Sequence, residues 1–134
     1  MAALLLVMAL MQGFMPPLRS LDKGTQSGIS TARQATARDL DQWTALWRAH
    51  ASDRPRPTVD LSREMVVGVF MGTRPTAGFA VEIQGYQEEG HEVIVRYRET
   101  SPARGALAAQ MLTSPYHLVV IPTRAGEVKF EKIQ

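Results

Sequence analysis

The sequence predicts an α+β fold, in which an antiparallel, mostly meander sheet of five to six strands packs against one N-terminal helix. Apolar residues recur at helical spacing over residues 37–50, and from residue 64 onward the pattern becomes that of strands separated by short loops. Because a parallel pair needs a crossover of about a dozen residues or more, short loops favour antiparallel pairing. We expect the sheet to curl into a sandwich or an open barrel.

The N-terminus predicts export. Residues 1–11, MAALLLVMALM, are uninterrupted apolar. Such a run is shorter than the roughly 20 apolar residues that a membrane-spanning helix needs, but it matches the apolar region of a secretory signal. No Lys or Arg precedes it, so a membrane anchor and a misassigned start are the alternatives. Residues 15–27 are rich in Pro, Gly, Ser and Thr, which predicts a linker. We expect signal peptide and linker over 1–27, one domain over 28–134, and no stable membrane span.

The first elements of this domain are a strand and a helix. The mild alternation in GISTARQA, residues 28–35, predicts a short edge strand. Thr36 followed by Asp39 fits a capping box at the start of a helix over 37–50. The apolar face of this helix recurs at steps of three and four and consists of Leu40, Trp43, Leu46, Trp47 and His50. The prolines of ASDRPRPTVD end the helix.

The strands follow in order. EMVVGVFM, residues 64–71, is apolar on both faces, which predicts a central strand covered on each side. GFAVEI (78–83) and HEVIVRYR (91–98) alternate, with GYQEEG between them as a hairpin connection. YHLVVIP (116–122) and EVKFEKI (127–133) predict two more strands, joined by the turn TRAG.

Composition excludes several classes of function. The chain has 134 residues, with 15 Lys and Arg against 13 Asp and Glu, and these charges are scattered along it. A nucleic-acid partner would need basic residues gathered on one face, so we expect none. The absence of cysteine removes disulfides, thiolate nucleophiles and cysteine-ligated zinc.

The segment MGTRPTAGFAVEI, residues 71–83, is not a phosphate loop. Gly72 and Gly78 are six residues apart, but no Lys follows the second glycine, and Phe79 begins a strand where a helix would be needed. The three histidines lack the spacing of a zinc site. We therefore expect neither a metal nor a cofactor.

Nucleophilic and glycosidic chemistry are also disfavoured. In TSPYH, Ser114 and His117 lack the G-x-S-x-G context, and adjacent residues on a strand point to opposite faces. The glutamates fall mostly at strand ends or in a hairpin loop, where a solvated surface is the usual role. We expect no catalytic residues and no enzyme.

Two rigid turns remain, GTRPTAG (72–78) and LTSPYH (112–117). Proline fixes φ in both, and Arg and Tyr are enriched at interface centres. The candidate partner-binding residues are Thr73, Arg74, Pro75, Thr76, Ser114, Pro115 and Tyr116. In the alternative reading, Gly72 and Gly78 supply positive φ or close packing, Pro75 shapes a turn, and Tyr116 sits in the core.

Three motifs resemble the PrcB-like family of bacterial protease-complex accessory proteins, through its PrcB C-terminal domain. They are VDLSREMVVGVFMGTRPTAGFAVEI (59–83), VRYRETSPARG (95–105) and LTSPYHLVVIP (112–122). The helix LDQWTALWRAH, with Trp43 and Trp47, fits the segment that precedes these motifs, so the similarity covers about residues 28–130. The resemblance implies an exported or envelope-attached, non-catalytic domain.

Three functions follow as hypotheses. The first is a protein-binding domain that helps to assemble a protease or another envelope complex through residues 72–78 and 113–117. The second is a protease inhibitor that presents residues 73–77 as a rigid loop. The third is a small-ligand carrier or hydrolase with a site in a barrel mouth. The expected partner is a protein: a protease or another envelope protein in the first case, and a protease in the second.

Overall fold

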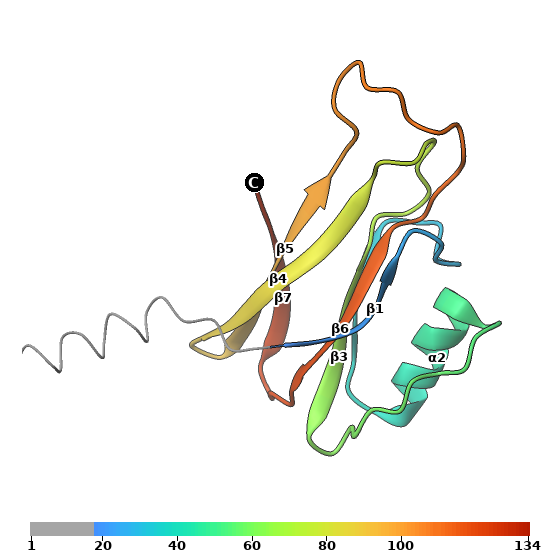
Figure 1. Ribbon diagram of the computed structural model, residues 1–134. Coiled ribbons are helices and arrows are strands. Elements are labelled where there is room, and N and C mark those ends of the chain that lie inside the picture. Colours follow the sequence, from blue (N-terminus) through green and yellow to red (C-terminus); the bar gives the residue numbers. More distant parts are fainter. Residues whose placement is uncertain (1–17) are drawn as a thin grey trace, which may run out of the picture.

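A computed structural model describes residues 18–134, and in this part the chain forms three layers (Figure 1). The middle layer is a four-stranded sheet in the order β1-β6-β3-β2, and the second sheet has the order β4-β5-β7. The helix α2 covers the other face of the first sheet. The elements are β1 (Arg19–Gly24), β2 (Arg33–Ala37), α2 (Leu40–Ala51), β3 (Glu64–Phe70), β4 (Ala80–Glu89), β5 (Glu92–Thr100), β6 (Tyr116–Pro122) and β7 (Glu127–Ile133).

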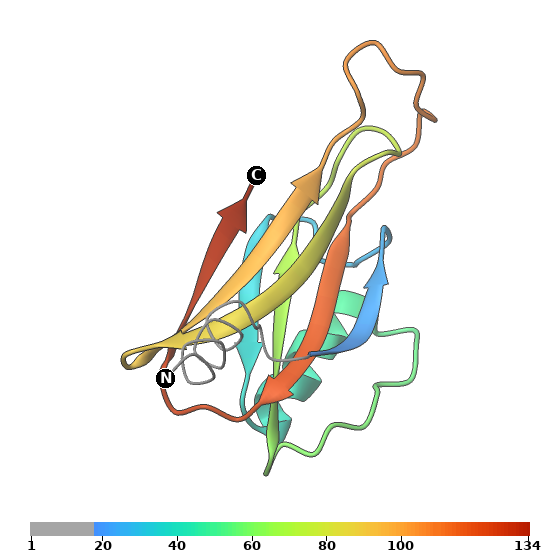
Figure 2. The ribbon, with the colours of Figure 1, turned by 60° about the vertical axis from the view of Figure 1, so that its left-hand side comes forward.

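This architecture confirms the α+β class with one packed helix, but it corrects the topology. The described residues form seven strands in two sheets that do not close, and β7 pairs with β5 in parallel. The reason is that the short connections at 71–79 and 123–126 carry the chain from one sheet to the other (Figure 2). The strands that they join are therefore not paired, and β6 serves as the crossover between β5 and β7.

The predicted linker contains a strand. β1 pairs antiparallel with β6, from Arg19 opposite Val120 to Gly24 opposite Tyr116. Its sequence, RSLDKG, is mostly polar because the strand lies at the edge of the sheet. For this reason the sequence pattern did not predict a strand here. The folded part thus includes residues 19–24. The predicted signal sequence falls on residues 1–17, outside the described residues.

The predicted helix is present, with a different cap. Asp39 is the N-cap, and its carboxylate accepts a hydrogen bond from the N–H of Gln42 at 2.8 Å. Thr36 lies in β2, so the capping box that begins at Thr36 is wrong. The buried face is confirmed for Trp43, Leu46, Trp47 and His50, whereas Leu40 is exposed. The helix is neither long nor apolar enough to cross a membrane.

Two strand boundaries differ from the prediction. The edge strand expected over 28–35 is β2, at 33–37. The segment GYQEEG is not a loop, because β4 continues through it to Glu89 and the turn lies at Gly90 and His91. A register shift between Ile83 and Gly85 turns Tyr86 into the core, where it is 2% exposed.

The central strand β3 separates two apolar cores, as its sequence predicted. Met65, Val67 and Val69 face the second sheet, in a core completed by residues of β4, β5 and β6. Val66 and Phe70 face α2 and pack with its two tryptophans. Because β3 is covered on both faces, it fixes the distance between the helix and the second sheet and holds the loops that follow it.

Candidate functional site

The structure brings the two predicted turns together at one end of the molecule (Figure 1). The N–H of Arg74 donates to the carbonyl of Thr113 at 2.7 Å, and the N–H of Thr113 donates to the carbonyl of Arg74 at 2.9 Å. These two bonds form an isolated antiparallel bridge between the segments. We call residues 72–78 and 101–114 the loop end.

The first of these loops, 72–78, is an inter-sheet connection and not the hairpin tip that a meander would give. Its two glycines have structural roles. Gly72 has φ +77°, and a Cβ there would lie 2.6 Å from the amide nitrogen of Ala32. Gly78 has φ +95°, and a Cβ there would lie 2.8 Å from a ring carbon of Pro102. Both positions require glycine for conformation and for space.

The backbone of this loop is held on several sides. The N–H of Thr73 donates to the carbonyl of Ser30 at 3.0 Å, and the N–H of Ala77 donates to the carbonyl of Ala109 at 3.0 Å. The hydroxyl of Thr113 donates to the carbonyl of Thr76 at 2.9 Å. The loop is therefore ordered before any partner binds.

The predicted side chains of residues 73–76 differ in exposure. Thr73 and Pro75 are exposed, whereas Arg74 and Thr76 are half-buried. The guanidinium of Arg74 lies over the ring of Phe79, 5.6 Å from its centroid. Thr73 and Pro75 are thus the two side chains of this loop that face solvent.

In the second turn, the structure separates the predicted residues. Ser114 is half-buried, with its hydroxyl 3.4 Å from that of Thr73. Pro115 and Tyr116 are buried, and Tyr116 is only 5% exposed, stacked near Phe70 in the helix-side core. These two residues are not available to a partner, and the alternative in which Tyr116 sits in the core describes it.

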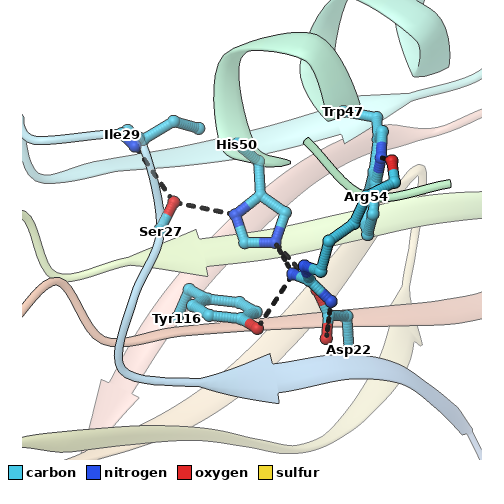
Figure 3. Close-up of polar contacts among 7 residues, drawn as sticks. All are labelled: Asp22, Ser27, Ile29, Trp47, His50, Arg54 and Tyr116. Carbon is cyan, nitrogen blue, oxygen red and sulfur yellow. Dashed lines mark hydrogen bonds and ion pairs between the residues drawn. The ribbon is translucent and has the colours of Figure 1, made fainter. Parts of the chain in front are cut away.

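The hydroxyl of Tyr116 belongs to a buried polar cluster that the sequence did not predict (Figure 3). His50 of α2 lies at its centre, with Nε2 2.8 Å from a carboxylate oxygen of Asp22 and Nδ1 2.8 Å from the hydroxyl of Ser27. Arg54 donates to the same carboxylate at 2.7 Å and to the hydroxyl of Tyr116 at 3.4 Å. We call Asp22, Ser27, His50, Arg54 and Tyr116 the buried cluster, after its two buried members His50 and Tyr116; Asp22 and Ser27 are half-buried, and Arg54 is exposed.

The charges of the buried cluster follow from its contacts. Burial raises the pKa of Asp22, but hydrogen bonds from Arg54, His50 and Tyr116 outweigh burial and hold this pKa below its ordinary value. Burial lowers the pKa of His50 despite the opposing effect of Asp22. At neutral pH, the imidazole of His50 is therefore neutral. Its Nε2–H donates a hydrogen bond to the Asp22 carboxylate, and its Nδ1 accepts one from the Ser27 hydroxyl.

Ser27, His50 and Asp22 are the residue types of a catalytic triad, and their hydrogen bonds clamp three segments of the chain together. The side chain of His50 has 0% exposure. The amides around the serine are all engaged: Ser27 donates to Ser114, Gly28 to His50, and Ile29 to the Ser27 hydroxyl. None is free to stabilise an oxyanion. The clamp ties β1, α2 and β6 to one another.

His117 forms a second polar link, between the two sheets. Its Nδ1 accepts the N–H of Ile83 in β4 at 2.9 Å, and its Nε2 lies 2.8 Å from the hydroxyl of Ser20 in β1. Burial is the main cause that lowers its pKa to about 4. His117 is therefore neutral at physiological pH and satisfies an amide that strand pairing leaves open.

The loop end gathers most of the exposed apolar surface. Of the four exposed large hydrophobic side chains among residues 18–134, three lie on it: Leu107 at 104%, Met111 at 48% and Leu112 at 70%. The fourth, Leu40, begins α2 at the other end of the molecule (Figure 1). Neither loop contains an Asp or Glu, and their charged residues are Arg74 and Arg104.

An enclosed ligand pocket or a metal site has little support among the described residues. Two hollows, of about 390 Å³ and 410 Å³, open at the surface, beside the β4–β5 turn and between β2 and α2 respectively. No three His, Asp or Glu side chains in residues 18–134 are grouped to hold a metal ion.

Fold and site together define a small α+β domain with two stacked sheets, one covering helix and an ordered, apolar loop end. The family model of the PrcB C-terminal domain matches residues 65–122, from β3 through β6, a range that includes both loops. The match confirms the resemblance to the PrcB C-terminal domain over this segment. Searches of curated proteins and of solved structures found no match.

Proposed function

We propose that this chain is an exported, non-catalytic accessory domain that binds a protein partner, a protease or another envelope protein, through the loop end. One observation carries the proposal. Leu107, Met111 and Leu112 are exposed together on loops whose backbone is held by the bridge between Arg74 and Thr113. The match of residues 65–122 to the PrcB C-terminal domain supports a protein as the partner, because the family that it resembles consists of protease-complex accessory proteins.

The composition of the loop end fits a protein interface. Apolar side chains gathered at one place on a monomer mark interaction sites, because the centre of an interface is depleted in charge. The bridge removes part of the ordering cost that a free loop would pay on binding. The complementary surface is expected to be apolar at its centre, with a carboxylate that faces the exposed Arg104.

The inhibitor hypothesis receives less support than the accessory role. A loop that binds a protease like a substrate offers its own N–H and C=O groups to the enzyme. In residues 73–77, the N–H groups of Thr73, Arg74 and Ala77 are already bonded within the chain. Insertion of this loop as an extended strand would break those bonds. The third hypothesis, a ligand carrier or hydrolase, lacks an enclosed pocket among the described residues.

Two other parts of the proposal rest on separate observations. The non-catalytic character is supported by the engaged amides around Ser27 and by the burial of His50. Export is supported by the apolar run of residues 1–11.

A matched capture experiment tests the proposal. Tagged full-length chain is incubated with envelope extract of the native host as wild type, as Leu107→Ser with Leu112→Ser, and as Leu40→Ser. The loop-end double variant is expected to lose a partner that wild type and Leu40→Ser both retain, and the purified partner should reproduce this difference. Equal yields of the same partners from all three proteins would refute the loop-end assignment.

If the captured partner is a protease, its activity separates the first two hypotheses. The accessory role predicts that the purified chain leaves peptide cleavage intact or raises it. Complete loss of cleavage at stoichiometric amounts of the chain would favour the inhibitor instead.

A further inference from the structure

The outer edge of β2 is an open strand edge. β2 is the last strand of the four-stranded sheet, and within residues 18–134 it pairs with β3 alone. The backbone N–H and C=O groups that point away from β3 therefore have no neighbouring strand. An edge of this kind is a template on which an extended chain can add as a further strand.

The other sheet edges carry features that discourage strand addition. β1 and β4 each contain a register shift, and an ion pair of 2.6 Å between Lys23 and Glu82 joins them. β7 has a charged residue at four of its seven positions, and Lys132 points to the inner face, level with the inward Tyr97. Irregular edges and inward charges are the devices by which proteins block edge pairing.

β2 has neither device. Its register with β3 is continuous, from Arg33 opposite Phe70 to Ala37 opposite Val66. Residues 34–37, Gln-Ala-Thr-Ala, carry no charge. Among the sheet edges of the described part, β2 is therefore the one suited to pairing with another chain.

The surface beside β2 is hollowed on both faces of the sheet. On the helix side, a groove of about 410 Å³ separates β2 from α2. Three alanines, Ala35, Ala45 and Ala49, line it together with Arg33, Thr36, Gln42 and Leu46. On the other side, a hollow of about 290 Å³ is lined in part by Gln34 and Tyr97, which are joined by a hydrogen bond of 3.2 Å, and by Glu99, which is paired with Lys132. Because successive side chains of a strand point to opposite faces, an added strand would place alternate side chains in the two hollows.

Arg33 sets the charge of the segment that fits. It is exposed, borders both hollows, and forms no ion pair with any residue of the described range. No acidic side chain lines the groove on the helix side. A carboxylate on the incoming segment would therefore meet an unpaired guanidinium.

We propose that β2 and α2 bind an extended segment of another protein, which adds as a fifth strand of the first sheet. The segment has small apolar side chains on the face toward Ala45 and Ala49, and a carboxylate level with Arg33. This site shares no residue with the loop end and does not rest on the function proposed for it, so the two can fail separately.

Peptide selection tests the inference. Random heptapeptides displayed on phage are panned on the full-length chain, and enriched peptides are measured by fluorescence anisotropy. The enriched sequences are expected to alternate, with small apolar residues and a carboxylate. Ala45→Trp and Ala49→Trp, which fill the groove from exposed positions, should each weaken binding at least about tenfold, and Arg33→Glu by about tenfold. Arg48→Trp, on another exposed side of the same helix, should stay within about twofold of wild type.

Backbone methylation of the peptide gives a second readout that needs no protein variant. N-methylation at alternate positions removes the N–H groups that face β2 and should abolish binding, while methylation at the intervening positions has a weaker effect. The proposal is overturned if no peptide is enriched, if the groove-filling variants bind as wild type does, or if no methylated position matters. A dimer of the free chain that Ala45→Trp dissociates would also overturn it, because the occupant would then be a second copy.

Discussion

The loop end and the buried cluster meet within one short stretch, LTSPYH, and they differ in exposure. Leu112 is 70% exposed, whereas Tyr116, four residues later, is 5% exposed. Between them, Thr113 pairs with Arg74 in the other loop. A rigid turn that contains interface-type residues can thus face outward at one end and inward at the other. Residue type alone does not tell which end meets a partner.

The two regions also differ in how their residues are connected. Each side chain of the buried cluster has hydrogen-bond partners from other elements, so a change there alters β1, α2 and β6 together. The leucines of the loop end are exposed, so their removal exposes no new core surface. We therefore expect stability to respond to the first region and partner binding to the second.

The largest loss of stability is expected from Tyr116→Ala. This change empties a buried aromatic site and removes the hydroxyl partner of Arg54. The free energy of unfolding should fall by about 3–5 kcal/mol, as for other buried aromatic residues changed to alanine. Urea unfolding monitored by circular dichroism measures it.

Tyr116→Phe is the control for this change, because it keeps the ring and removes the hydroxyl alone. It should cost about 1 kcal/mol. If Tyr116→Ala were as stable as wild type and lost only partner binding, the division between the two regions would be wrong.

Acid should also lower the free energy of unfolding, through the two buried histidines. The pKa of His117 falls from 6.5 to about 4 on folding, chiefly through burial. Below pH 6.5 the unfolded chain therefore binds a proton that the folded chain does not, and stability decreases as pH falls. The loss from His117 grows between about pH 6.5 and pH 4 and reaches about 3 kcal/mol. His50, whose pKa is also lowered, adds to it.

Unfolding free energies at several pH values measure this loss. His117→Gln should be less stable than wild type at pH 7 and lose less stability as pH falls. A flat wild-type profile between pH 7 and pH 4 would contradict the neutral, buried state of both histidines.

The sequence predicted the elements that a periodic apolar face defines. The helix and β3 were found because Trp43, Trp47 and the run EMVVGVF are needed to fill two cores. The two-sheet topology was missed because a short loop is compatible both with a hairpin and with a step between sheets. β1 was missed because an edge strand needs few apolar residues, and Leu21 is the one large apolar residue of the segment RSLDKG.

The buried cluster could not be predicted from the sequence, for a related reason. Asp22 and Ser27 fell in the predicted linker, and nothing in their spacing links them to Arg54. One sign was present: His50 lies on the apolar face of the helix, and a histidine buried there needs polar partners. In the loop end, the sequence identified residues 72–78 and the segment from Leu112 onward, but it missed the exposed Leu107 and Met111. The bridge between Arg74 and Thr113 depends on the crossing of the chain between sheets.

The smallest effect on stability, and the sharpest test of the comparison, is expected from Leu107→Ser with Leu112→Ser. Both side chains are exposed, so the free energy of unfolding should stay within about 0.5 kcal/mol of wild type per change. The same double variant should lose the captured partner, which Leu40→Ser retains. Urea unfolding and capture on the same preparations separate the two effects. A double variant that unfolds several kcal/mol more easily would mean that these leucines pack against the domain in solution, and the loop end would then be part of its core instead of its interface.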